Sequence, residues 1–223
     1  MILASGSLRR QQFLRDLGLD FTVAVADIDE TPLAGEAPLE MTLRLAAAKA
    51  AAVAARRQPA GASAIIVASD TTVAVDGVIL GKPVDPDDAG HMLRLLRNRS
   101  HQVISAICLL RTGEGARLQR VNTTTVWMRD YTDQEIDVYV LSGDPLDKAG
   151  AYGIQHRGFN PVSALDGCYA GVMGLPLADF SDLLAQFGVR TPIPATQACS
   201  AFNTFSCCAT HLAHSTHIDL PID

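Results

Sequence analysis

The stretch from Ile65 to Pro83 constrains the fold of this chain more than any other part of the sequence. Its first four residues, Ile65 to Ala68, form a short continuous apolar run, which is the pattern of a strand covered on both faces. We expect this strand to end where Ser69-Asp70-Thr71-Thr72 begins. Polar side chains would then emerge at the carboxyl end of a buried strand, which is where α/β proteins bind their ligands.

The second half of this stretch predicts a β-hairpin. Val73 to Val75 and Val78 to Leu80 flank Asp76-Gly77, a pair that tolerates the positive φ angles of a type I′ turn. Such a hairpin would carry Lys82 back towards Asp70. The carboxylate suits a metal ion or a water molecule and the ammonium suits a phosphate, but a surface ion pair explains the same two residues equally well.

Composition limits the class of protein and its partners. With 223 residues, 48% of them hydrophobic, the chain can bury a sizeable core as one domain or two joined lobes. No run of about 18 apolar residues indicates a membrane span, and the first residues lack the pattern of a signal peptide. The five cysteines form no Cys-x-x-Cys pair, so we expect a reduced, cytoplasmic protein. A net charge of −6 argues against nucleic-acid binding but allows a small polyanionic ligand where basic groups gather.

The N-terminal residues predict an anion-binding turn. Met1 to Ala4 reads as a short strand, and Ser5-Gly6-Ser7 leads into a helix from Leu8 to Leu17 with Ser7 as its N-cap. Arg9 and Arg10 occupy the first turn of this helix. Free backbone amides and two guanidinium groups favour a phosphate or carboxylate cradle, although both arginines could simply be solvated.

The next segment offers carboxylates and a lysine. A strand from Phe21 to Ala26 is followed by Asp27-Ile28-Asp29-Glu30, whose three carboxylates could hold a hard cation such as Mg²⁺. Solvated loop acids are the commoner explanation of such a run. A helix from Pro38 to Arg57 carries Lys49 on an apolar side, where the lysine either extends to water or reaches into a cleft.

Periodicity and capping signals predict the remaining elements. His101, at the start of a strand, is expected to be structural and not catalytic. The expected elements are a helix that begins after Asp85, strands at 101–110 and 116–128, a helix opened by the capping box Thr132 to Glu135, a hairpin at 162–173 and a helix at 178–187.

Two segments stand apart from these elements. In Asp144 to Gln155, small residues let the backbone approach a ligand closely, and Asp147, Lys148 and Gln155 supply polar groups; a tight structural crossover is the alternative. We count Lys148 among the substrate-binding residues. The tail from Arg190 to Asp223 has little periodicity and few charges, so we expect a poorly ordered, dispensable extension after a domain of residues 1–189.

A zinc site in the tail is the less favoured alternative, because the spacing of its cysteines and histidines fits no standard site. The residues that such a site would use are Cys199, Cys207, Cys208, His211, His214 and His217.

Five motifs, in this order along the chain, resemble the Maf family of nucleoside triphosphate pyrophosphatases, which are also known as septum-formation inhibitors. The likeness runs from Met1 to about Gly188. Leu8 departs from it, because the family usually has proline there, at a helix position where leucine costs little. The motifs are Leu3-Ala4-Ser5-Gly6-Ser7-Leu8-Arg9-Arg10, Asp29-Glu30-Thr31, Ser69-Asp70-Thr71 with Gly81-Lys82-Pro83, Asp147 to Gln155, and Gly174-Leu175-Pro176.

The resemblance implies an α/β fold like that of inosine triphosphate pyrophosphatases, with an elongated, curved mixed sheet, flanking helices and two lobes around a cleft, often as a homodimer. It implies hydrolysis of a nucleotide between its α- and β-phosphates. Asp70 would be the general base, and Glu30 with Asp70 would hold a divalent cation, Mg²⁺ or alternatively Mn²⁺. The residues that would bind the triphosphate are Ser7, Arg10, Lys49 and Lys82.

The resemblance also implies a substrate class. Arg9, Thr71 and Gln155 match family positions that are associated with substrate choice. The Ala-Tyr-Gly-Ile-Gln form resembles the branch that acts on dTTP and UTP, and the alternative is the branch that acts on 7-methyl-GTP. The implied role is house-cleaning of nucleotide pools or control of septum formation. A nucleotide-binding regulator of cell division with little turnover is the rival from another class.

Overall fold

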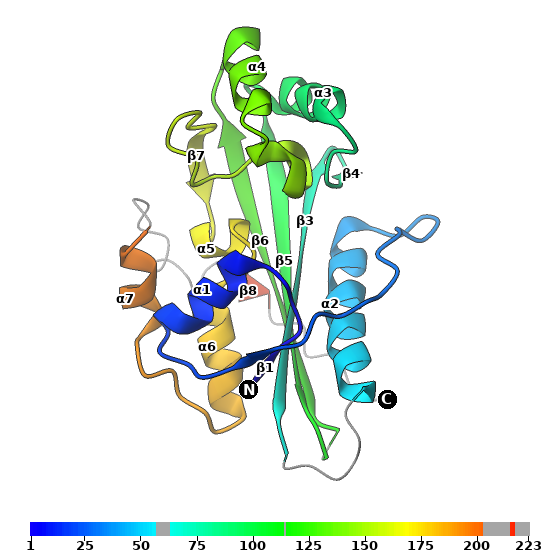
Figure 1. Cartoon of the computed structure of the whole chain (residues 1–223), viewed down its shortest axis with the longest axis vertical. Helices are drawn as coiled ribbons and strands as arrows, with labels where there is room; N and C mark the ends of the chain where they lie inside the picture. The colour runs from blue at the N-terminus through cyan, green and yellow to red at the C-terminus, as the bar shows by residue number, and fades with distance from the viewer. Residues whose placement is uncertain (57–62, 114, 203–214, 217–223) are drawn as a thin grey trace.

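The computed structural model of the chain describes residues 1–56, 63–113, 115–202 and 215–216. It is an α/β protein built on one mixed sheet with strand order β2-β1-β3-β5-β6-β7, in which β4 also pairs with β3 and β8 with β6 (Figure 1). β1 pairs in parallel with β2 and β3, and the other pairings are antiparallel. The strands are β1 (Ile2–Leu3), β2 (Thr22–Val23), β3 (Ile65–Val75), β4 (Val78–Leu80), β5 (Ser100–Arg111), β6 (Arg117–Met128), β7 (Val162–Asp166) and β8 (Ser215–Thr216).

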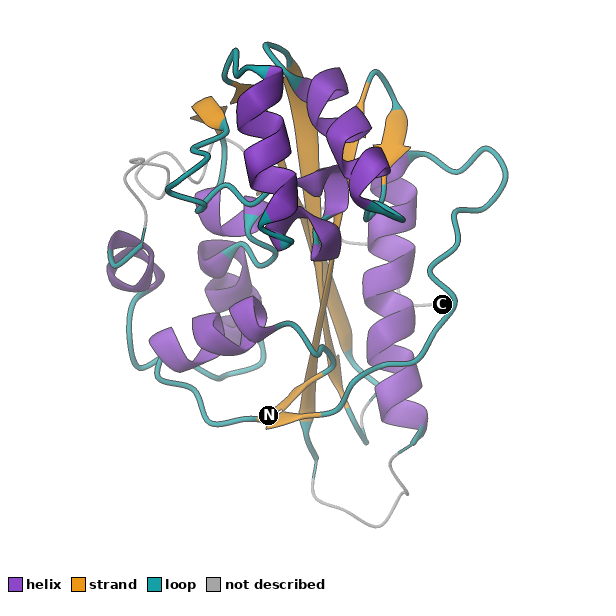
Figure 2. Cartoon of the chain, turned by 45° about the horizontal axis from the view of Figure 1, so that its top comes forward, coloured by secondary structure: helices purple, strands orange, loops and turns teal. Residues whose placement is uncertain are grey.

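Helices cover both faces of the sheet and one of its ends. Figure 1 shows α2 on one face, α1, α5 and α6 on the other, and α3 with α4 at the far end of the long strands. Figure 2 brings that end forward and shows its helices lying across the strands. The helices are α1 (Leu8–Asp16), α2 (Pro38–Ala55), α3 (Pro86–Leu96), α4 (Asp133–Leu141), α5 (Tyr169–Val172), α6 (Leu177–Gln186) and α7 (Ala195–Ser200), with short 3₁₀ helices η1 (Asp144–Asp147) and η2 (Ala149–Ala151).

Three apolar clusters divide the molecule into two lobes. In the lower lobe, Ala46 and Val53 of α2 pack on one face of the sheet, while Phe13 of α1 and Phe180 of α6 pack on the other. In the upper lobe the cluster centres on α3 and α4, with Leu93, Ile136 and Tyr139 as members. The long strands β3, β5 and β6 run through both lobes (Figure 1). The predicted elongated, two-lobed α/β architecture is confirmed.

Local sequence signals account for several element boundaries. Ser7 Oγ accepts a hydrogen bond from the backbone N–H of Arg10, and the Asp85 carboxylate accepts one from Asp88 N, so both residues cap their helices as predicted. The predicted capping box of α4 is also present. Asp76 and Gly77 have φ angles of 51° and 78°, which is the positive pair that a type I′ hairpin requires.

The expectation that the first strand ends before Ser69 is wrong. β3 continues without a break to Val75 and pairs with β5 from Ile65 to Ala74, because the β-branched residues Thr71 and Thr72 suit an extended strand. β1 pairs with the other edge of β3 only at Ile66 and Val67, and β4 pairs there only from Val73. Asp70 therefore lies mid-strand, on a length of edge that has no strand partner among the described residues.

The predicted hairpin at 162–173 is also wrong. β7 is followed by the short helix α5. Gly167 has a φ angle of +131°, and a Cβ atom there would lie 2.6 Å from Thr124 Oγ1. The chain turns at this glycine, and Cys168 Sγ then caps α5 by accepting a hydrogen bond from Gly171 N.

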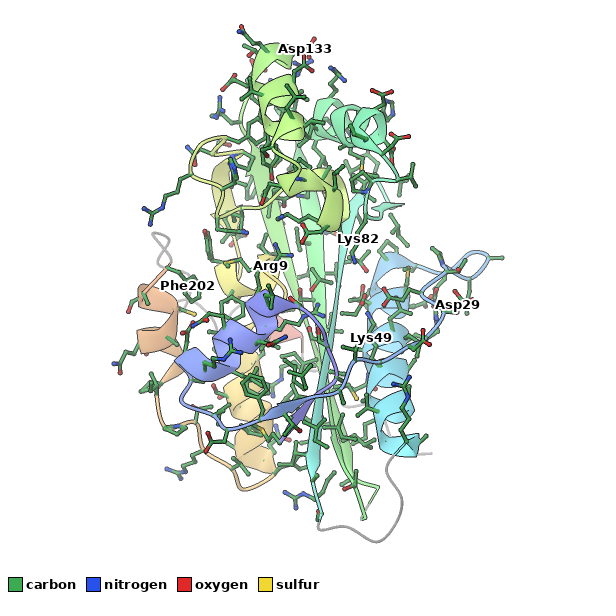
Figure 3. The ribbon with its side chains drawn as sticks, viewed as in Figure 1. Arg9, Asp29, Lys49, Lys82, Asp133 and Phe202 are labelled. Atoms are coloured by element: carbon green, nitrogen blue, oxygen red, sulfur yellow. The ribbon has the colours of Figure 1, made fainter. Side chains whose placement is uncertain are left out.

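Part of the tail is packed and not poorly ordered. Ile193 N donates to the carbonyl oxygen of Leu17 over 3.1 Å, Cys199 is buried against the α1–α6 core, and the Phe202 ring lies 5.1 Å from the Phe13 ring. Figure 3 labels Phe202 beside α7. The expectation therefore fails for 190–202, and the domain boundary at residue 189 stays a prediction. The other zinc candidates, Cys207, Cys208, His211, His214 and His217, lie outside the described residues.

The described helices include none that is both long and apolar enough to cross a membrane.

Candidate active site

The free edge of β3 opens into a cavity of about 570 Å³ between the two lobes. α1 and α2 supply its lower wall, and the segments after β4 and α4 supply its upper wall. Figure 3 shows Arg9 on α1, Lys49 on α2 and Lys82 after β4, approaching from three directions. All of the predicted site residues line this cavity: Ser7, Arg9, Arg10, Glu30, Lys49, Asp70, Thr71, Lys82, Lys148 and Gln155.

A charge cluster, buried except for Glu30, forms one end of the cavity. Lys49 Nζ lies 2.6 Å from Asp70 Oδ1 and 2.9 Å from Glu30 Oε1. Lys49 and Asp70 are only 8% and 6% exposed, so each charge depends on the other for compensation. Of the two alternatives for Lys49, the structure shows the one in which the side chain reaches into the cleft.

The two carboxylates in this cluster suit a divalent cation. Glu30 and Asp70 already converge on one positive charge, and carboxylate oxygens are the ligands that Mg²⁺ prefers. In the part of the chain that the structure describes, no group of three or more acidic, histidine or cysteine side chains could hold a metal ion. A cation bound here would therefore have two protein carboxylates and complete its shell with phosphate oxygens and water, as Mg²⁺ commonly does.

The predicted three-carboxylate cluster at 27–30 does not form in the cavity. Glu30 lines it, whereas Asp27 and Asp29 do not. Asp29 Oδ1 instead accepts a hydrogen bond from Thr31 N over 2.9 Å, and hydrogen bonding from Thr31 lowers the pKa of Asp29. Figure 3 shows Asp29 on the loop before α2. Asp29 therefore stabilises the turn in which it lies and does not line the cavity.

Arg10 organises the cavity wall. Its Nε donates to the carbonyl oxygen of Gly174 over 2.9 Å, Nη1 to Ser5 Oγ over 3.3 Å, and Nη2 to Thr71 Oγ1 over 3.3 Å. Burial lowers the pKa of Arg10, with neighbouring Arg9 adding to the effect and Asp70 opposing it. These bonds join α1, β3 and the segment before α6. Arg10 therefore connects these three segments of the wall, in addition to its predicted role in binding phosphate.

The upper wall is built from the 144–155 segment. Lys148 Nζ donates to Asp144 Oδ1 over 3.0 Å and to Asp147 Oδ1 over 2.6 Å. Tyr139 donates to Asp144 Oδ2, and the Tyr139 hydroxyl in turn accepts from Gly153 N. Burial acts to raise the pKa of Asp144, but the hydrogen bonds from Tyr139 and Lys148 outweigh it and the pKa is lowered. The turn that carries Lys148 and Gln155 is thus held by a polar network in the upper lobe.

The two ends of the cavity differ in chemistry because side chains alternate along a strand. Asp70 projects from β3 towards Lys49 of α2, and Thr71 projects towards Arg10 of α1. Val73 shares the face of Thr71 and is paired with Val103 on β5. The apolar lining of this second end comprises Val73, Val103, Tyr152, Ile154, Val172 and Met173.

Sequence reasoning does not single out three residues of the site, although two of them, Ser5 and Tyr152, lie within predicted motifs. Ser5 and Tyr152 line the cavity, and Ser105 lies behind Thr71, with 2.8 Å between their hydroxyl oxygens. The role of Ser105 depends on the register that sets it opposite Thr71, for which one sequence carries no signal. His101, predicted to be structural, contacts the hydroxyl of Tyr152 over 2.7 Å through Nε2, and burial lowers its pKa to about 4.

Comparisons with known proteins give one consistent likeness for this chain. The family model described as "Maf-like protein" matches residues 1–187. The "dTTP/UTP pyrophosphatase" of Chromobacterium violaceum is 45% identical over 194 residues, which cover 85% of this chain and 96% of the relative. A second relative of that name, from Symbiobacterium thermophilum, is 43% identical over 84% of this chain and 94% of its own. A third, from Pelotomaculum thermopropionicum, is 39% identical over 84% and 96%.

Proposed function

The chain belongs to the Maf family, and we propose that it is a nucleoside triphosphate pyrophosphatase that converts dTTP and UTP to their monophosphates and pyrophosphate. One observation carries the proposal: a single cavity joins a charged end, with Lys49, Asp70 and Glu30, to an apolar end beside Thr71. With a divalent cation on its two carboxylates, the charged end suits a triphosphate, and the apolar end suits a base. Relatives named dTTP/UTP pyrophosphatase support the choice of substrate.

In the proposed mechanism Asp70 is the general base. Its carboxylate accepts a proton from the water that attacks the α-phosphorus, and Lys49, 2.6 Å away, orients it. Lys82, which is exposed and lines the cavity, and Ser7 at the N-terminus of α1 offer donors to the phosphates. Arg10 and Lys148 complete this set from the two lobes. A divalent cation held by Glu30 and Asp70, Mg²⁺ or alternatively Mn²⁺, would neutralise charge on the triphosphate.

Base choice in this proposal falls to Gln155, with Arg9 and Thr71. A glutamine amide offers a donor and an acceptor side by side. The donor complements O4 of uracil or thymine, and the acceptor for N3–H is either the amide oxygen or a neighbouring hydroxyl such as that of Thr71. A guanine methylated at N7 carries a positive charge and would be matched better by a carboxylate. The chemistry of this residue thus favours dTTP and UTP over 7-methyl-GTP.

Pyrophosphate release tests the proposal. The wild type and Asp70→Asn are assayed with Mg²⁺ against a panel of standard and modified nucleoside triphosphates. We expect dTTP and UTP to be the best substrates, and turnover by Asp70→Asn to fall by a factor of about 10² or more. If the wild type binds nucleotide tightly but releases no pyrophosphate, the result would favour the rival hypothesis of a nucleotide-binding regulator of cell division. If Asp70→Asn is as active as the wild type, Asp70 is not the general base.

The proposal includes a cytoplasmic, homodimeric enzyme that acts in nucleotide-pool house-cleaning or septum control. Buried Cys108 is a free thiol whose pKa is raised to about 12 by burial, and a free thiol is compatible with a reducing compartment. Light scattering after size exclusion measures the mass in solution. A mass of one chain at micromolar concentration would contradict the dimer.

A further inference from the structure

We propose that Ser105 sets the base preference of this site, because it fixes the hydroxyl of Thr71 as a hydrogen-bond acceptor towards the nucleobase. Ser105 touches no ligand in this scheme and acts as a positioning residue. The inference rests on the proposed function and deepens it, since it explains how the site would separate uracil and thymine from cytosine.

Three hydrogen bonds determine where each proton lies. Ser105 Oγ is 2.7 Å from the carbonyl oxygen of Gly171, and a carbonyl only accepts, so Ser105 donates its single proton there. Thr71 Oγ1 is 2.8 Å from Ser105 Oγ, so Thr71 must be the donor of that bond. Arg10 Nη2, which only donates, lies 3.3 Å from Thr71 Oγ1. The Thr71 proton is committed to Ser105, and its oxygen keeps a lone pair.

The surroundings of Ser105 keep these hydrogen bonds directed from Thr71 to Ser105 and from Ser105 to Gly171. Ser105 is only 1% exposed, so water does not readily replace either of its partners. Strand register sets Ser105 directly opposite Thr71, and cross-strand neighbours project from the same face of a sheet. Thr71 is half-buried and lines the cavity. It therefore presents an acceptor, and not a rotatable hydroxyl, to whatever the cavity binds.

Thr71 lies at the end of the cavity that suits a base. It shares its face of β3 with Val73 and faces away from the Lys49–Asp70 charge cluster. Uracil and thymine carry a proton at N3, and cytosine carries a lone pair there. A buried acceptor such as Thr71 Oγ1 is satisfied by N3–H, whereas two facing lone pairs leave both groups unpaired. The geometry therefore selects a base with an N–H donor on this edge.

The test compares UTP with CTP. We expect the wild type to prefer UTP in kcat/KM by about tenfold or more, and Ser105→Ala to reduce that preference to about threefold or less, because the freed Thr71 hydroxyl can then donate to N3 of cytosine. Ser105→Thr, which keeps a hydroxyl, should restore the preference. Dissociation constants of UMP and CMP, measured by calorimetry, should show the same changes without any turnover.

Ser69→Ala is the matched control. Ser69 is a buried β3 serine that donates to the carbonyl oxygen of Gly174 over 2.9 Å, so its removal costs a similar structural bond but leaves Thr71 and Ser105 intact. We expect this variant to keep the wild-type preference. If Ser105→Ala does not fold, Thr71→Val tests the same acceptor and should also lose the preference.

The two proposals fail in different ways. A wild type that releases no pyrophosphate from any nucleotide overturns the proposed function, and the UMP and CMP affinities still report on Ser105. A folded Ser105→Ala, or failing that Thr71→Val, that keeps the wild-type preference in these assays overturns the inference about Ser105. A preference lost equally in Ser69→Ala overturns it too, because the loss would then come from general loosening.

Discussion

Single residues decide the chemistry of the cavity, and base choice is the clearest case. Gln155 lines the upper wall beside Lys148, close enough that a Cβ atom added to Gly153 would lie 3.1 Å from both side chains. Gln155 therefore belongs to the wall that a ligand would contact, and a charge introduced at this position should act directly on that ligand.

Gln155→Glu is expected to erode the preference for dTTP and UTP over purine nucleotides and to raise the relative activity on 7-methyl-GTP. A site whose polar groups are left unpaired by the wrong base loses about 1–3 kcal/mol per group, which corresponds to roughly tenfold or more in kcat/KM. Gln134→Glu makes the same change on the exposed side of α4, outside the cavity, and should leave the ranking unchanged. An unaltered ranking in Gln155→Glu would show that this residue does not read the base.

The buried ring of His101 predicts how the stability of the protein depends on pH. Its pKa is about 4 in the folded protein because the ring is buried, against an ordinary value of 6.5. Between these values the unfolded chain binds a proton that the folded chain does not. The His101 ring therefore leaves the free energy of unfolding at its full value above pH 6.5. As the pH falls to about 4, this free energy decreases by about 3 kcal/mol.

Urea unfolding between pH 7.5 and 4 measures this effect. His101→Gln should lose stability at neutral pH but show a shallower fall towards acid than the wild type does. His91→Gln, at an exposed position on α3, should retain the wild-type slope. If His101→Gln has the same slope as the wild type, another group controls the acid sensitivity.

At the scale of elements, the turn between α4 and β7 connects the upper lobe to the cavity. Gly150 has a φ angle of +70°, and a Cβ atom there would lie 2.9 Å from Cγ1 of Val73. Gly150 N also donates to the carbonyl oxygen of Gly81, just before Lys82. The glycine therefore lets η2 approach β3 closely and ties the two segments of the upper wall together.

Gly150→Ala is expected to destabilise the protein by about 2–4 kcal/mol, from the positive φ angle and the contact with Val73, and to raise KM because the turn that carries Lys148 and Gln155 must shift. Gly143→Ala is the control: its φ angle is +74°, but nothing lies within 4 Å of the added Cβ atom. It should cost only the backbone strain, about 1–2 kcal/mol, with KM unchanged. Equal effects of both changes on KM would disprove the role of the close approach.

At the scale of the whole molecule, the C-terminal segment belongs partly to the core. Ala198 and Cys199 are buried against the cluster that contains Phe13 and Phe180, and Phe202 packs on Phe13. The expectation that the tail is dispensable therefore remains only for 203–223, of which the structure describes only β8, paired with β6.

Ending the chain after Arg190 should lower the melting temperature, because it removes contacts worth about 2 kcal/mol or more of apolar burial. Ending it after Phe202 keeps those contacts and, among the described residues, removes only the two-residue strand β8. Both melting temperature and turnover should then stay close to those of the full chain. The two truncations are compared by calorimetry and pyrophosphate release. Equal melting temperatures for both would show that α7 adds no stability.

The sequence by itself determined the elements whose signals are local. Ser7 and Asp85 cap their helices because a short polar side chain reaches the backbone two or three residues ahead, and Asp76-Gly77 turns the hairpin because both residues tolerate positive φ angles. The motifs were enough to predict the family, and all ten predicted site residues line one cavity. Which of them act on substrate remains a prediction.

Only the tertiary structure decided what depends on contacts between distant segments. The polar run from Ser69 to Thr72 looked like the end of a strand, but pairing with β5 keeps it extended, and the gap between β1 and β4 exposes its edge to the cavity. Cross-strand register set Ser105 behind Thr71 and thereby the direction of a hydroxyl. Such positions follow from packing across the sheet, which no local pattern encodes.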